Sequence, residues 1–235
     1  PLLCSLRYLS YMGLDSTTFP ITGLSRLGSL HTVYLYKNNI TVLRGMSFSG
    51  NVTDLNLGNN NITTLPSQLI TGGTCHLEAL DLKNNFISVL PPKLIENCTD
   101  IQKLNFANNL ITSCPADFLR TLNSLTELVL EGNQFTAINP STLLMPEVKL
   151  SQIAIQVTLE DNNIRYIATG FVNPTFSVHL ILTRNPSVFF QDGVLDKMAI
   201  SSTPKFIPPS KFVFQYRLEM ILLGLKRSWT FTYRL

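Results

Sequence analysis

Apolar and polar residues repeat along most of the chain with a period near 24. Seven asparagines mark the register, because each lies five residues after one apolar residue and three residues after another. The intervals between successive members are 22, 25, 24, 24, 29 and 23 residues. Repetition at a period of roughly 20 to 29 residues indicates a solenoid, in which stacked turns bury one continuous core. The asparagines are Asn38, Asn60, Asn85, Asn109, Asn133, Asn162 and Asn185.

Each repeat predicts a short strand with one buried face. Leu55 and Leu57 alternate with Asp54 and Asn56, so the leucines face one way and the polar residues face the other. The asparagine that follows ends the strand. Because its amide offers two donors and an acceptor, a stacked column of asparagines can satisfy the backbone of neighbouring turns. Proline then follows the last core residue in four places, where its missing N–H ends the pairing and turns the chain.

Five repeats carry the full pattern LxxLxLxxNxLxxL, counted on the first five asparagines of the column. This pattern strongly resembles the leucine-rich repeat family, and the resemblance extends over about residues 6–190. It implies an α/β fold, a right-handed curved solenoid of about eight turns. A parallel sheet is expected on the concave face, with short helical turns or irregular loops on the convex side. The repeat length and the phenylalanines on the returning segments are similar to those of Toll-like receptors and secreted leucine-rich-repeat ectodomains.

The pattern fades at both ends, as expected of capping turns. We predict a solenoid over residues 1–190 and a C-terminal cap or poorly structured tail over residues 191–235. The solenoid region holds 11 basic and 12 acidic residues, a balance of −1, and therefore has no general attraction for nucleic acid. An amphipathic segment in the tail could cover the open end or contact a membrane, but no apolar run is long enough to span one. Without an initiator methionine or a signal segment, the chain is expected to be a fragment or a mature product.

The cysteines and the glycosylation acceptors bear on the cellular compartment. Cys114 occupies a core leucine position, which predicts a buried thiol. Cys75 and Cys98 lie just before the strands of adjacent repeats, which predicts either two buried thiols, the interpretation we favour, or a disulfide between neighbouring turns. Four Asn-x-Thr triplets are N-glycosylation acceptors, although repeats rich in these residues also produce such triplets by composition. They start at Asn39, Asn51, Asn61 and Asn97. We interpret them as favouring an extracellular or receptor-ectodomain location over a cytoplasmic one.

No catalytic motif is present in the sequence. It has no HExxH, no phosphate-binding glycine loop, no nucleophile elbow and no cysteine pair at zinc spacing. The three histidines fall in three separate repeats. We therefore predict no enzymatic turnover, no cofactor and no metal site.

The concave surface is the predicted binding site. Parallel strands place their outward positions in rows about 4.8 Å apart. Tyr34 and Tyr36 both face outward, and tyrosine is common in protein-binding surfaces, although strand propensity alone also favours it. Acidic residues collect on the later repeats, where they could equally keep the strip soluble. The candidate ligand-binding residues are Tyr8, Tyr34, Tyr36, Lys37, Glu127, Glu131, Glu160 and Asp161.

The resemblance implies recognition of another macromolecule, most often a protein. We predict a non-enzymatic protein-binding module, of the kind found in receptor ectodomains. Three alternatives stay open: an intracellular scaffold or effector, the targeting region of a larger enzyme such as a receptor kinase, and a carbohydrate binder that stacks sugars on Tyr34 and Tyr36. The sequence does not determine the ligand or the oligomeric state.

Overall fold

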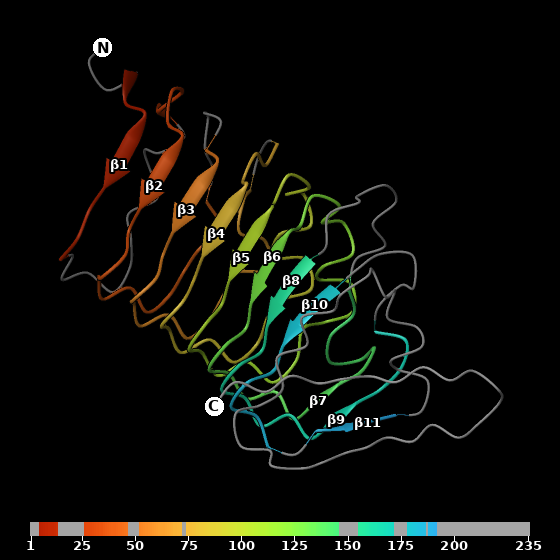
Figure 1. Cartoon of the computed structure of the whole chain (residues 1–235). Coiled ribbons are helices and arrows are strands. Elements are labelled where there is room, and N and C mark those ends of the chain that lie inside the picture. Colours follow the sequence, from red (N-terminus) through yellow and green to blue (C-terminus); the bar gives the residue numbers. More distant parts are fainter. Residues whose placement is uncertain are drawn as a thin grey trace.

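Short parallel strands form one continuous sheet along the molecule (Figure 1). The computed structural model describes residues 5–13, 26–46, 52–71, 74–145, 155–171, 178–186 and 188–191. Each strand pairs with the next one along the chain, in the order β1-β2-β3-β4-β5-β6-β8-β10, so the chain advances by one strand per repeat. The predicted solenoid is confirmed. Its strands are β1 (Tyr8–Ser10), β2 (Thr32–Tyr34), β3 (Asp54–Asn56), β4 (Ala79–Asp81), β5 (Lys103–Asn105), β6 (Glu127–Val129), β8 (Ile155–Thr158) and β10 (Val178–Ile181).

The core leucines of the repeats lie opposite one another in the sheet. Leu104 of β5 pairs with Leu80 of β4 on one side and with Leu128 of β6 on the other. All three side chains are fully buried. Because this register continues from strand to strand, a repeat position in the sequence becomes a row on the surface.

The column of asparagines lies inside the core and joins the turns. The amide nitrogen of Asn109 donates to the carbonyl oxygens of Phe106 in its own turn and Leu82 in the preceding turn, both at 3.0 Å. Its Oδ1 accepts the backbone N–H of Ile87, also at 3.0 Å. The same acceptor bond recurs for six of the asparagines. An unsatisfied buried polar group costs about 1–3 kcal/mol, and this ladder supplies each amide with partners.

Where the structure describes them, the returning segments close the core without α-helices. Phe118 from one such segment packs edge-to-face on Phe106, with ring centroids 6.0 Å apart. The described residues contain no α-helix, so the helical component of an α/β solenoid is absent from them. Instead, three returning segments form a second parallel sheet, which the sequence did not predict (Figure 1). Its strands are β7 (Ala137–Ile138), β9 (Tyr166–Ile167) and β11 (Phe189–Phe190).

The predicted cap or tail lies outside the described residues, apart from residue 191, and so does Asn51. In the part of the chain that the structure describes, no helix is long and apolar enough to cross a membrane.

Candidate binding surface

The outward side chains of the eight-stranded sheet, together with the residues that directly follow its strands, form a strip that we call the strand face. In strands β2 to β6 the central residue is buried and its two neighbours are partly or largely exposed. Strand register then determines which outward residues are neighbours. This is the surface that the sequence predicted as concave. One of its rows contains Tyr8, Thr32, Asp54, Ala79, Lys103, Glu127 and Gln156.

The first two strands carry an aromatic cluster, which we call the aromatic end: Tyr8, Tyr34, Tyr36 and Lys37. The Tyr8 and Tyr34 rings meet edge-to-face with centroids 5.3 Å apart, and Tyr34 and Tyr36 meet in the same way at 6.5 Å. The ammonium of Lys37 lies 5.9 Å from the centroid of the Tyr36 ring, within cation–π range. Tyr8 is 52% exposed. The structure therefore brings the four N-terminal candidate residues together.

The opposite end of the strand face is built around one arginine that the sequence analysis missed. We call this cluster the acidic end: Glu131, Glu160, Asp161 and Arg184. The guanidinium of Arg184 lies 3.6 Å from the carboxylate of Glu131 and 3.8 Å from that of Glu160, and it donates a hydrogen bond to Asp161. This hydrogen bond, with the charges of the three carboxylates, raises the pKa of Arg184. Three negative charges and one positive charge leave the cluster at −2.

The remaining acidic candidate belongs to a different contact. Glu127 pairs with Lys103 of the neighbouring strand at 3.7 Å. Between the two ends, Asp81 pairs with Lys83 at 3.6 Å and accepts a hydrogen bond from the Asn56 amide at 3.4 Å. The middle of the strand face thus satisfies its own charges, and only some of the acidic candidates lie together.

Comparisons with known proteins agree with the repeat and the sheet. A model described as "Leucine rich repeat" matches residues 75–135, and a second with the same description matches residues 51–72. The structure is similar to the crystal structure of the LRIM1/APL1C complex, with a TM-score of 0.50 over 80% of this chain. The chain therefore contains leucine-rich repeats at residues 51–72 and 75–135. Its 15% identity to that structure shows the fold alone, and the match spans 41% of that chain.

Two further structural comparisons are weaker, each with a TM-score of 0.42. One is an octameric complex of latrophilin 3, Unc5D and FLRT2 (LRR), at 23% identity, covering 82% of this chain and 71% of that chain. The other is internalin C2 from Listeria monocytogenes, at 25% identity, covering 75% of this chain and 80% of that chain. None of the curated proteins compared with the chain matches it.

A row of left-handed backbone residues precedes the asparagine column of the solenoid, and the sequence analysis missed it. The amide of Asn84 donates to that of Asn59 at 3.0 Å, and the amide of Asn108 donates to that of Asn84 at 2.9 Å, which makes a second, exposed ladder. Asparagine, aspartate and glycine tolerate this conformation best, and their enrichment was the available signal. The row comprises Gly13, Lys37, Asn59, Asn84, Asn108, Gly132, Asp161 and Arg184.

A disulfide joins two turns of the leucine-rich repeat on the approach to strands β4 and β5. Cys75 and Cys98 are buried and bonded, with a Cα–Cα distance of 4.8 Å. Of the two alternatives left open by the sequence, the structure contains the bonded pair, not the two thiols that we favoured, because the two cysteines sit at equivalent points of adjacent turns. Cys114 is a free thiol, and burial raises its pKa above the ordinary value.

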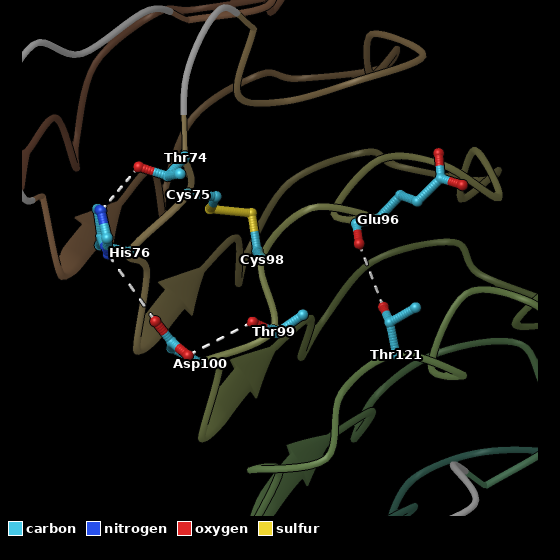
Figure 2. The surroundings of a disulfide bond; sticks show 8 residues. All are labelled: Thr74, Cys75, His76, Glu96, Cys98, Thr99, Asp100 and Thr121. Atoms are coloured by element: carbon cyan, nitrogen blue, oxygen red, sulfur yellow. Dashed lines mark hydrogen bonds and ion pairs between the residues drawn. A yellow bond between two sulfur atoms is a disulfide. The ribbon is translucent and has the colours of Figure 1, made fainter.

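A shallow hollow of about 560 Å³ lies beside the disulfide. Figure 2 shows His76 there between Thr74 and Asp100. The Thr74 hydroxyl lies 2.8 Å from Nε2 of His76, but Nδ1 is 3.9 Å from the Asp100 carboxylate, too far for the hydrogen bond that orients a catalytic base. The order of groups resembles a hydrolytic triad, yet its geometry does not support one. No group of three or more acidic, histidine or cysteine side chains among the described residues could hold a metal.

Three of the four glycosylation acceptors are described, and all three are exposed. Asn39 and Asn61 lie in one row, where the backbone N–H of Asn61 donates to the carbonyl oxygen of Ile40 at 2.9 Å. Asn97 lies at the hollow beside the disulfide. Each of these side chains has room for a glycan on the solvent side.

Proposed function

We propose that this chain is a non-enzymatic protein-binding module that recognises its partner through the strand face, mainly at the aromatic end. The contacts from the exposed Tyr8 through the half-buried Tyr34 to the half-buried Tyr36 carry this proposal. Tyrosine and tryptophan anchors dominate the energetics of many protein interfaces. Rings that already contact one another lose little conformational freedom on binding, which lowers the entropic cost of association.

The surrounding surface supports the same choice. The middle of the strand face and the acidic end pair their own charges, and such groups must be desolvated before they can contact a partner. Among the described residues, the aromatic end has no ion pair to break; the Lys37 ammonium contacts the Tyr36 ring there. A similar fold occurs in the LRIM1/APL1C complex, which is an assembly of proteins.

The test is partner capture with matched variants of the full chain. Immobilised wild type, Tyr34→Ser/Tyr36→Ser and the control Asp117→Ser/Arg120→Ser are exposed to extract from the native source. The control removes an exposed pair from a returning segment, away from the strand face. A partner is identified by quantitative mass spectrometry and its affinity is then measured with purified components. We expect the tyrosine variant to lose at least about tenfold in affinity, and the control to bind like wild type.

Melting temperatures of the three proteins separate lost binding from lost folding. Partners that bind the tyrosine variant as well as the wild type would contradict the proposal. An equal loss of affinity in the Asp117→Ser/Arg120→Ser control would mean that the interface is not specific to the aromatic end.

We propose in addition that the chain functions outside the cell, in a secreted protein or a receptor ectodomain. The Cys75–Cys98 disulfide supports this, because disulfides persist mainly in oxidising compartments. The exposure of Asn39, Asn61 and Asn97 supports it as well. Glycopeptide mass spectrometry on protein from its native source is expected to find glycans at these positions and a bonded Cys75–Cys98 peptide. Unmodified asparagines together with free thiols would instead indicate the cytoplasmic alternative.

A further inference from the structure

The first two turns of the solenoid have an unusual charge distribution. Their described residues, 5–13 and 26–46, contain Arg7, Arg26, Lys37 and Arg44 and no aspartate or glutamate. Further along the chain, five cations each lie within 4.0 Å of a carboxylate. Arg7 and Lys37 have no carboxylate partner among the described residues, so their charges are available to a partner molecule.

Arg7 and Lys37 lie next to the tyrosines of the aromatic end: Arg7 directly precedes Tyr8, and Lys37 directly follows Tyr36. Arg7 directly precedes β1, and its carbonyl oxygen accepts the backbone N–H of His31 at 2.9 Å. Lys37 lies six residues after His31, a span on the order of 20 Å for extended chain. Within the described residues, none of the phenol hydroxyls of Tyr8, Tyr34 and Tyr36 has a hydrogen-bond partner, and each can donate to a carboxylate or a carbonyl oxygen.

We propose that the aromatic end binds an acidic polypeptide segment, whose carboxylates pair with Arg7 and Lys37 and whose apolar groups pack on the tyrosine rings. This inference rests on the proposed protein-binding function and names the chemistry of the partner. The cations select and orient the segment, because exposed ion pairs contribute little affinity but strongly affect association rate and specificity. The rings supply most of the binding energy.

The spacing of the groups favours a polypeptide over a sulfated polysaccharide or a nucleic acid. Polyanions of those classes are held by a continuous row of cations that follows their backbone. Here the outward positions beside Arg7 and Lys37 on the first two turns are Tyr8, Ser10, Thr32, Tyr34 and Tyr36, which are uncharged and mostly aromatic. An acidic peptide with apolar side chains between its carboxylates matches this order of groups.

The test measures the Kd of a short fluorescein-labelled peptide of glutamate, serine and phenylalanine for the full chain, from the increase in the peptide's fluorescence anisotropy. A lysine, serine and phenylalanine peptide and labelled heparin serve as comparison probes. We expect Arg7→Glu/Lys37→Glu to raise the Kd of the acidic peptide by about tenfold or more. The matched control Arg26→Glu/Arg44→Glu changes the net charge equally but lies on the segments before and after the strand face, and its Kd is expected to stay within about twofold of wild type.

Two tyrosine variants resolve the contribution of the rings. Tyr34→Phe/Tyr36→Phe keeps the rings and should retain most of the affinity, whereas Tyr34→Ser/Tyr36→Ser should lose it. Circular dichroism confirms that each variant is folded.

Three results would overturn the inference. The first is an equal loss of affinity for the acidic peptide in both charge-reversal variants. The second is that the acidic peptide does not bind wild type. The third is that heparin binds through Arg7 and Lys37 while the acidic peptide does not bind. Suppose that a captured partner loses affinity in the Tyr34 and Tyr36 variants but binds Arg7→Glu/Lys37→Glu as well as wild type. This result would contradict binding of an acidic segment but would still support the protein-binding function. Captured partners insensitive to both sets of variants would contradict the function itself.

Discussion

The aromatic end and the acidic end lie on the same sheet, in continuous rows, but they differ in how their polar groups are paired. At the acidic end, Arg184 contacts Glu131, Glu160 and Asp161. At the aromatic end, Arg7 and Lys37 have no carboxylate partner among the described residues. A cluster of like charges in the sequence therefore identifies a binding site poorly, because a residue from the next turn can neutralise it.

The comparison also shows why the aromatic end is the better candidate. A partner at the acidic end must compete with an internal arginine, whereas a partner at the aromatic end meets partly exposed rings and, among the described residues, cations without a carboxylate partner. Burying the rings removes apolar surface from water, which favours binding by roughly 25 cal/mol for each Å² buried. Burying a paired carboxylate gives no such gain.

The disulfide lies between the two ends, and its removal tests whether they belong to one cooperative unit. In Cys75→Ala/Cys98→Ala, loss of a cross-link between residues 23 apart in sequence is expected to cost about 3 kcal/mol. Because a solenoid is held by contacts between neighbouring turns, weakening the centre should separate the unfolding of the two halves. Urea titration followed by circular dichroism measures both effects. Reductant should destabilise wild type to a similar extent and leave the variant unchanged; a variant as stable as wild type would contradict the prediction.

Two glycines in the left-handed row allow the crowding at the two ends to be compared directly. Gly132 has φ +64° and lies beside Asn108, whose Oδ1 would be 2.2 Å from an added Cβ; Gly13 has φ +78° and nothing within 4 Å. An L-residue in this conformation costs about 1–2 kcal/mol. Gly13→Ala should therefore lose about 1 kcal/mol of unfolding free energy, and Gly132→Ala about 2–3 kcal/mol, because Asn108 must also give up its contact.

A double variant separates the two contributions at Gly132. Asn108→Ala/Gly132→Ala removes the obstructing amide and should return the cost of the glycine substitution to that of Gly13→Ala. If Gly132→Ala and Gly13→Ala are equally destabilising, crowding contributes nothing at this row.

The period of the sequence was enough to predict the solenoid, since a fixed spacing of core residues permits only stacked turns. The same register placed Leu104 in the core and Tyr34 on the surface, as the structure has them. It did not predict the second sheet of β7, β9 and β11, because returning segments carry no strict apolar alternation. Nor did it reveal the role of Arg184. That residue precedes Asn185, so the register could have placed it beside Asp161.

The candidate binding site is less predictable than the fold for a physical reason. Core positions accept few residue types, so they repeat visibly in the sequence. Surface positions accept many types, and their function depends on which neighbours from adjacent turns they contact. The tyrosines of the aromatic end could be assigned to one face, but the edge-to-face contacts between them and the missing carboxylates around Lys37 emerge only from the folded rows.

Removing one positive charge from each end gives the smallest predicted effect and compares the two ends most directly. Arg184→Gln should release three carboxylates and raise the affinity for a lysine-rich peptide several-fold. Lys37→Gln changes the net charge equally, but because no described carboxylate pairs with Lys37 it should leave that affinity unchanged. Both differences should shrink in about 1 M salt, where the Debye length falls to about 3 Å. Anisotropy with a labelled lysine peptide measures all of this, and equal responses from the two variants would mean that overall charge, not local pairing, distinguishes the two ends.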